Sequence, residues 1–462
     1  MQASSHTPHP QVPSPESRDS YGERLPRSVG LFASIMVLIG ITIGSGIFRV
    51  PATVAESLPA PGPFLLVWVL GGVMALFGAL TLAELAALYP RSGGVLAYLA
   101  EGFGPMPAFL FGWSQLVIIR ASALGAISTI FAEYLGQFIT LTPEQVHYVA
   151  AMLIGAIGLL NWVGVQRAAV VNNFATGIKY LALIGLVVFA FTAPTGSAAN
   201  FSPLWTEALS ISAFATALVP VMWAYDGWGD LSFMSGEVKD PGRTMPRALI
   251  LGTLLIVAIY LLVNAAYVYL VPLSEMAQPQ SGLIAATAAE RIPAFGGVGA
   301  RLIAAVVMIS TFSSVNGTMM ASPRIFFGMA DRGLFFKGIA RVSPRFKSPS
   351  TSILLASMLG IVYVLFNDFQ QLAQKFVLGI FPFYFLAVLA VFVIRRREPE
   401  LARPYRVLGY PVVPVVFLLG TVGMIANALI TQTADTAFTF GIILAGIPVY
   451  YIARATGKIK AS

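Results

Sequence analysis

The sequence predicts an all-α integral membrane protein with about twelve transmembrane helices, two of which are interrupted. Of its 462 residues, 57% are hydrophobic and only 10% are charged, a composition too apolar for a protein whose whole surface faces water. A membrane-spanning helix needs about 20 largely apolar residues, and such runs follow one another along the chain. No polar stretch is long enough for a second domain, so one transmembrane domain is expected over residues 29–453.

The expected spans follow from the apolar runs and the polar residues between them. They cover residues 30–56, 63–89, 105–138, 146–164, 168–192, 208–236, 244–271, 298–328, 350–366, 371–394, 411–431 and 436–453. Residues 1–28 are rich in proline and serine, which predicts a disordered tail. Residues 454–462 are expected to form a short polar tail.

The basic residues are distributed unevenly between the loops. The net charge of +8 would suggest a nucleic acid partner for a soluble protein, but here the lysines and arginines gather in alternate loops, for example in segments 332–347 and 395–406. The positive-inside rule then places both termini in the cytoplasm, which an even number of spans also requires. We expect a multi-pass protein of the inner or plasma membrane with the lipid bilayer as its surroundings and no nucleic acid partner.

The residues of metal sites and covalent catalysis are scarce. The chain has no cysteine, so disulfides, thiolate metal sites and a disulfide-linked subunit are excluded. The three histidines, His6, His9 and His147, fall in the tail or in a short connection. No histidine or paired-carboxylate constellation lies within the spans, so we expect no enzyme, no metal and no cofactor.

The first expected span is broken by glycine. It runs apolar to Ile43, meets Gly44, Ser45 and Gly46, and resumes at Ile47. In lipid, a broken helix is tolerated only where it lines a protein-walled cavity. The half that ends near Ile43 directs free carbonyl groups into the gap, and the half that begins near Gly46 directs free N–H groups and the positive end of its dipole there.

A second break lies in the sixth expected span, at Tyr225 to Asp230. The free carbonyls of Trp223, Ala224 and Tyr225 are candidate partners of an ammonium group, and Gly227 lets the chain turn. Two such breaks in corresponding halves of a chain indicate a transporter's substrate site near the bilayer midplane. A small zwitterion fits the paired gaps, with its carboxylate at the N–H groups and its ammonium at the carbonyls. The alternative is that the glycines only let helices pack closely.

Several motifs carry a resemblance to a known family. These are Gly-Ser-Gly-Ile-Phe at 44–48, Ala-Glu-Leu at 83–85, Ser-Gly-Gly at 92–94, Ile-Ile-Arg at 118–120, Ala-Tyr-Asp-Gly-Trp at 224–228, Ser-Val-Asn-Gly at 314–317, Pro-Arg-Ile-Phe-Phe at 323–327 and Arg-Glu-Pro-Glu-Leu at 397–401. The chain resembles the amino acid–polyamine–organocation superfamily, and within it the L-type amino acid transporter branch, from about residue 29 to 406.

The resemblance implies a LeuT-like fold. Its first ten spans would form two inverted five-helix repeats, at about 29–192 and 208–394, followed by two further helices at 411–453. The substrate carboxylate would bind the N–H groups of Ser45, Gly46 and Ile47. The substrate amino group would bind the carbonyls of Ile43, Trp223 and Tyr225.

The resemblance also implies roles for single side chains. Trp223 stands where the family has a gating aromatic, whose size would favour small substrates, although ordinary helix packing is an alternative. Phe381 resembles another pocket aromatic. Lys179 stands where this branch replaces a sodium ion with a lysine, which implies sodium independence, and snorkelling towards an interface is its alternative. Arg120 lacks the proline that usually follows it, so its role stays open.

Asp226 and Asp230 lie in the second break and could carry protons or cap the second half-helix. We therefore expect a sodium-independent transporter of small to medium neutral L-amino acids that works by alternating access, as an exchanger. Proton-coupled symport is the alternative. A substrate sensor on the same fold is a remote one, since such proteins typically carry a sizeable soluble output segment.

Overall fold

The computed structural model describes residues 27, 29–90, 93–163, 165–205, 210–278, 283–331, 333–336, 338–339, 343 and 348–457. In these ranges the chain is helical. Its α-helices are α1 (Leu31–Thr42), α2 (Gly46–Ser57), α3 (Pro61–Leu88), α4 (Val95–Phe103), α5 (Pro105–Ser114), α6 (Arg120–Leu135), α7 (Pro143–Val163), α8 (Val165–Thr192), α9 (Ile211–Tyr225), α10 (Trp228–Leu231), α11 (Pro241–Leu270), α12 (Leu273–Met276), α13 (Ile284–Glu290), α14 (Gly299–Asp331), α15 (Ser350–Phe366), α16 (Phe369–Arg397), α17 (Val412–Thr431) and α18 (Thr433–Ala455).

Eight helices within the described ranges are long and apolar enough to cross a membrane, and the bent pair of α1 and α2 makes a ninth. The remaining expected spans correspond to shorter helices. Of these, α15 and the 177–192 part of α8 are apolar but shorter, and α9 ends after 15 residues at the second break. The all-helical membrane architecture is confirmed, whereas the count of twelve spans stays a prediction.

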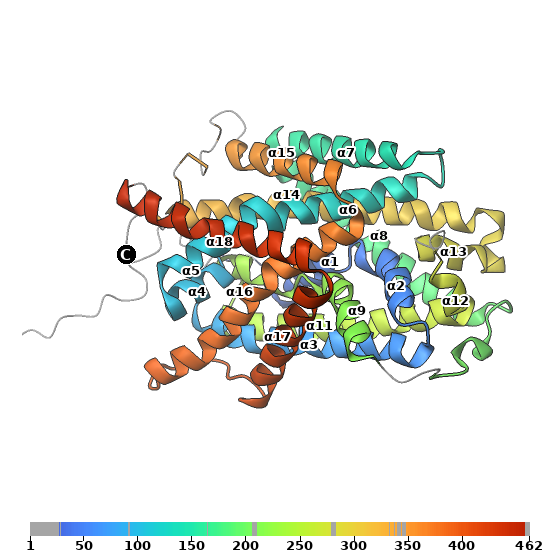
Figure 1. The fold of residues 1–462 in the computed structure, drawn as a ribbon, viewed down its shortest axis with the longest axis horizontal. Coiled ribbons are helices and arrows are strands. Elements are labelled where there is room, and N and C mark those ends of the chain that lie inside the picture. Colours follow the sequence, from blue (N-terminus) through green and yellow to red (C-terminus); the bar gives the residue numbers. More distant parts are fainter. Residues whose placement is uncertain are drawn as a thin grey trace, which may run out of the picture.

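The helices form one bundle around the two broken spans. Figure 1 shows α1 and α9 near the middle, α7 and α15 along one edge, and α3 and α11 on the opposite side. Close approach of α3 and α11 depends on Gly72, because a Cβ atom there would lie 2.9 Å from a methyl group of Val257. Small residues at such crossings let helix backbones approach each other in membranes.

A buried aromatic cluster holds α3, α9 and α11 together beside the breaks. The ring of Trp68 lies 5.9 Å from that of Tyr225 and 6.0 Å from that of Tyr260, with edge-on geometry. The Tyr225 hydroxyl also donates to the carbonyl of Trp68 at 3.1 Å. These contacts fix the position at which α9 ends.

The segment before α1 is tied to the segment that follows the second break. The Val29 N–H donates to the Glu237 carbonyl at 3.0 Å, and the Lys239 N–H donates to the Val29 carbonyl at 2.8 Å. The expected disordered tail at 1–28 lies outside the described residues apart from Arg27, and so do residues 458–462 of the other tail. The inverted repeats and the domain limits stay predictions.

Candidate functional site

The first break lies where the sequence predicted it. Helix α1 ends at Thr42, α2 begins at Gly46, and the two helices are bent by 45°. Ile43, Gly44 and Ser45 connect them, and the carbonyl of Gly44 accepts a 3.4 Å hydrogen bond from the Ser310 hydroxyl of α14. The first N–H groups of α2 have no partner within their own helix. The positive end of α2 is thus directed at the gap.

The second break is sharper than expected. After α9 ends at Tyr225, Gly227 adopts φ +133°, α10 has only four residues, and the chain continues as a 3₁₀-helix over Ser232–Glu237. Gly227 is the N-cap of α10 and has no side chain to make a capping bond. Neither Asp226 nor Asp230 is therefore the N-cap residue of α10, although Asp230 lies in its first turn, and both carboxylates also have partners at the cavity.

The two breaks meet at α11. The hydroxyl of Tyr260 lies 3.0 Å from the carbonyl of Thr42 and 3.0 Å from that of Ala224, the last turns of the two half-helices. A Cβ atom at Gly46 would lie 2.6 Å from the Cα atom of Ala224. Glycine at 46 is thus required by packing between the breaks. Close packing, the alternative considered for the glycines of the breaks, thus applies to Gly46.

A cavity of about 50 Å³ lies at the junction of the breaks. Six of the predicted site residues line it: Gly44, Ser45, Gly46, Trp223, Asp226 and Asp230. The described lining also includes Arg120, Ser314, Thr318 and Phe376, which the sequence did not single out as pocket residues. It does not include Ile43, Ile47, Ala224, Tyr225 or Gly227, which are neighbours in the chain of residues that do line it.

Arg120 forms the strongest charged contact at this cavity. Its guanidinium bonds both carboxylate oxygens of Asp230, at 2.6 and 3.3 Å, and their side chains are 3% and 8% exposed. A five-residue π-helical turn, Gln115–Ile119, precedes Arg120. The Nε–H group of Arg120 donates to the side-chain Oε1 atom of Gln115 at 2.9 Å. Such π-turns occur often at functional sites. In the sequence, the only local indication of this ion pair is that Arg120 is a lone charge within an apolar run.

Asp226 lies beside that ion pair but bonds a neutral group. The Tyr384 hydroxyl of α16 donates to its Oδ1 atom at 3.0 Å. The Tyr384 ring in turn packs 4.5 Å from that of Trp228 in α10. The cavity therefore combines a neutralised pair with a further carboxylate.

Lys179 of α8 contacts the C-terminal end of α1. It is fully buried, and its Nζ atom donates to the carbonyl of Gly40 at 2.6 Å. The bond is made within the last turn of α1, just before the first break. Because the side chain is buried, it does not extend to an interface, so the snorkelling alternative is wrong.

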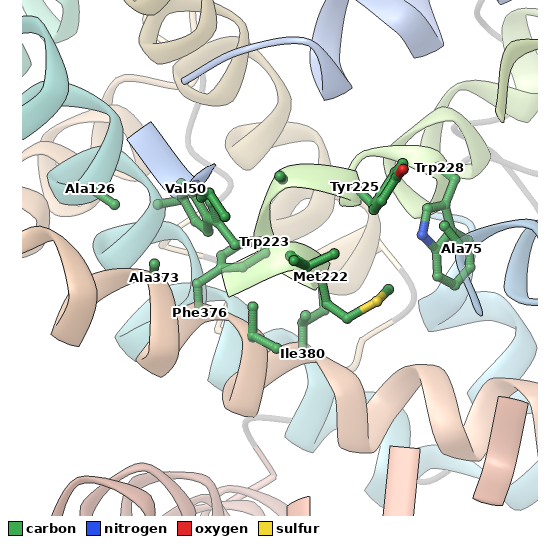
Figure 2. Packing of buried hydrophobic residues seen from close by; sticks show 14 of the residues in the cluster. Val50, Ala75, Ala126, Met222, Trp223, Tyr225, Trp228, Ala373, Phe376 and Ile380 are labelled. Carbon is green, nitrogen blue, oxygen red and sulfur yellow. The ribbon is translucent and has the colours of Figure 1, made fainter. Parts of the chain in front are cut away.

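Trp223 forms an aromatic layer with two phenylalanines of α16. Its ring lies 4.9 Å from Phe376 and 6.3 Å from Phe369, and Figure 2 shows it beside Phe376 and Ala373. The guanidinium of Arg49, on α2, lies 5.6 Å from the Phe369 ring and also pairs with Glu133 at 3.2 Å. The layer thus joins α2, α9 and α16 at one end of the cavity.

Phe381 lies away from this cavity. Its ring packs 5.6 Å from Tyr384 and 6.3 Å from Phe417 of α17. Phe376, five residues earlier on α16, is the aromatic residue of this helix that lines the cavity. Among the described residues, no cluster of three or more histidine, cysteine or acidic side chains could hold a metal ion.

Two broken helices that meet at a cavity lined by buried charges define a membrane transporter. Residues 29–453 match the amino acid permease family, and the chain belongs to it. This confirms the resemblance to the amino acid–polyamine–organocation superfamily: the protein is an amino acid transporter and not an enzyme.

Characterised relatives cover nearly the whole chain. It is 30% identical to the serine/threonine exchanger SteT of Bacillus subtilis, over 92% of this chain and 97% of the exchanger. It is 31% identical to the human b(0,+)-type amino acid transporter 1, over 95% of this chain and 90% of that protein. The human cystine/glutamate transporter is 29% identical over 96% of this chain and 89% of its own length. Since the chain has no cysteine, it cannot form a disulfide with a heavy subunit.

Proposed function

We propose that the protein exchanges small to medium neutral L-amino acids across the cell membrane by alternating access, without sodium. The observation that carries the proposal is the meeting of two broken helices at one cavity, with the start of α2 on one side and the carboxylates of Asp226 and Asp230 on the other. Exchange is favoured because SteT, which this chain resembles over nearly its full length, is an exchanger. The proposed scaffold has twelve spans, ten of them in two inverted repeats, with both termini in the cytoplasm.

The proposed substrate is a zwitterion held mainly by backbone groups. Its carboxylate would bind the N–H groups of Ser45, Gly46 and Ile47 at the start of α2, where the helix dipole favours an anion. Its ammonium would bind the carbonyls of Ile43, Trp223 and Tyr225. The carbonyls of Thr42 and Ala224, next to these in the chain, both lie 3.0 Å from the Tyr260 hydroxyl. The ends of α1 and α9 are therefore close together, which supports the binding of one ammonium group by carbonyls of both helices.

The cavity must enlarge before it can hold this substrate. Pockets that hold small molecules have volumes of about 300–1,000 Å³, so about 50 Å³ is too little for an amino acid. Enlargement requires the aromatic layer of Trp223, Phe369 and Phe376, or the helices around it, to move. This supports Trp223 as the gate in an alternating-access cycle.

Lys179 is proposed to replace a sodium ion. A buried ammonium supplies a fixed positive charge beside the carbonyls that end α1. A sodium ion at this place would be bound by the same carbonyls, so the ammonium of Lys179 makes the binding of sodium unnecessary. The proposal predicts that transport does not respond to a sodium gradient.

Proton-coupled symport is the second candidate function. It is favoured by Asp226, a carboxylate that lines the cavity and bonds the neutral hydroxyl of Tyr384. Asp230 is less suited, because Arg120 already neutralises it. A proton carried by Asp226 would couple uptake to a pH gradient.

Transport by purified protein in liposomes separates the two functions. An exchanger takes up labelled alanine only when the vesicles contain an unlabelled amino acid, and neither a sodium nor a pH gradient replaces it. Uptake into empty vesicles driven by an inward pH gradient would instead identify the symporter. Uptake that follows the sodium gradient would contradict both.

A further inference from the structure

A second and larger cavity lies outside the aromatic layer. It has a volume of about 340 Å³ and is lined by residues of α2, α9 and α16 together with the first residues of α18. Phe369 lines it, whereas Trp223 and Phe376 line the small cavity. The layer of Trp223, Phe369 and Phe376 therefore lies between the two cavities. We call the larger one the vestibule.

The sizes of the two cavities differ in a way that matters for a ligand. Pockets that hold small molecules have volumes of about 300–1,000 Å³. The vestibule falls within that range, whereas the cavity at the helix breaks, at about 50 Å³, lies well below it. In this conformation an amino acid fits the vestibule and does not fit the inner cavity.

Three carboxylates line the vestibule. Glu56 lies in the last turn of α2, Asp368 is the N-cap of α16, and Asp435 lies in the first turn of α18. Asp435 is paired with Lys375 at 3.0 Å. Glu56 is 3.5 Å from the amide of Gln370, and Asp368 accepts the Gln371 N–H at 2.8 Å. One of the three carboxylates is thus neutralised by a cation, and the lining keeps a negative charge.

Two buried polar side chains of the vestibule lack a partner within the described part of the chain. The Nε2 atom of Gln374 and the hydroxyl of Thr53 are buried without a hydrogen bond, and each residue is only 9% exposed. A buried polar group without a partner costs about 1–3 kcal/mol. Both residues line the vestibule, so a ligand there could supply the missing bonds.

We infer that the vestibule is a second amino acid site, in which Glu56 and Asp368 bind the ammonium group and Gln374 and Thr53 bind the carboxylate of the same molecule. The inference rests on the proposed function for the identity of the ligand. The amino acid occupies the vestibule first and passes to the helix breaks when the aromatic layer opens. The negative charge of the vestibule raises the local concentration of ligands with an ammonium group, just outside the aromatic layer.

The absence of cysteine in this chain allows a direct test. Gln370 lines the vestibule and is exposed, so Gln370→Cys introduces a single thiol that a membrane-impermeant maleimide can label. L-Alanine is the probe. At a concentration tenfold above its Kd it should slow labelling about tenfold, because roughly one site in ten then stays free.

Protection must be separated from binding at the helix breaks. Ala123 lines the small cavity, so Ala123→Leu fills it, and Gln370→Cys is labelled in that background. Should this variant fail to give a monodisperse protein, Ser314→Leu fills the same cavity from α14. Glu144→Cys, exposed at the start of α7 and outside the vestibule, is the matched control, and alanine should not protect it.

Protection of Gln370→Cys that survives Ala123→Leu and is lost in Gln374→Leu supports the second site. If Ala123→Leu abolishes protection, or if Gln374→Leu and Glu56→Gln both leave it unchanged, the inference is overturned. Alanine exchange by the otherwise unchanged protein is measured alongside. Normal exchange without vestibular protection overturns the second site alone, whereas protection without exchange overturns the proposed function alone.

Discussion

The guanidinium of Arg120 and the carboxylate of Asp230 form a buried two-bond ion pair that joins α6 to the short helix α10. The pair crosses the cavity wall between a helix that is continuous through its π-turn and the half-helix that follows the second break. A buried pair of this kind is costly to break, because removal of one partner leaves an uncompensated charge in a dry environment. It therefore sets the position of α10 relative to α6.

Removal of one member of this pair should destabilise the protein strongly. We expect Arg120→Met or Asp230→Leu alone to cost about 3–5 kcal/mol. The double variant should recover much of this stability and still lack transport, because both side chains line the cavity. Thermal unfolding of the four proteins in detergent completes a double-mutant cycle. Strictly additive effects would show that the pair has no coupling energy.

Gly46 should tolerate no side chain at all. The added Cβ atom would meet the backbone of Ala224 at 2.6 Å, and overpacking of this kind costs about 1–3 kcal/mol. Gly46→Ala should therefore lower both the unfolding temperature and transport. Gly155→Ala, on α7 with nothing within 4 Å, is the control and should leave both unchanged. Full stability together with lost transport would instead give Gly46 a role in substrate contact only.

Lys179 is expected to be required for turnover in sodium-free buffer. Lys179→Met keeps most of the side-chain volume and removes the ammonium that bonds Gly40. Exchange should fall to a small fraction of the wild-type rate. Lys375→Met, which removes a different buried lysine that pairs with Asp435, should leave the response to sodium unaltered. Should the wild type itself respond to sodium, the replacement of an ion by Lys179 would be wrong.

Phe376 and Phe381 form a matched pair on α16. Phe376 lines the cavity, whereas Phe381 packs against Tyr384 and Phe417. Phe376→Leu should change the relative affinities for small and large amino acids, and Phe381→Leu should change stability by about 0.5–3 kcal/mol without altering that order. Competition for labelled alanine uptake by a panel of amino acids measures the order. A changed order in Phe381→Leu alone would restore Phe381 as the pocket aromatic.

Much of the fold and part of the site could be predicted from local patterns. Apolar runs mark spans, and Gly44 and Gly46 mark a break, because both signals lie within a few neighbouring residues. The Arg120 and Asp230 pair could not be predicted in this way. Its members lie 110 residues apart, and nothing in the sequence around either residue indicates the other as its partner. The resemblance pointed to Phe381 rather than Phe376. Periodicity could not correct this, because α16 is apolar on most sides and does not mark the face towards the cavity.

Trp223 should limit the size of the substrate. Its ring closes one end of a cavity of only about 50 Å³ and is held there by Phe376 at 4.9 Å. A pocket wall discriminates by about 1–3 kcal/mol for each methylene group that does not fit. Trp223→Ala should therefore shift relative affinity towards larger side chains by at least about tenfold, and it should slow exchange because the layer closes less tightly. Competition by alanine, leucine and phenylalanine measures the shift. An unchanged order of the three in Trp223→Ala would rule out the indole as the size filter.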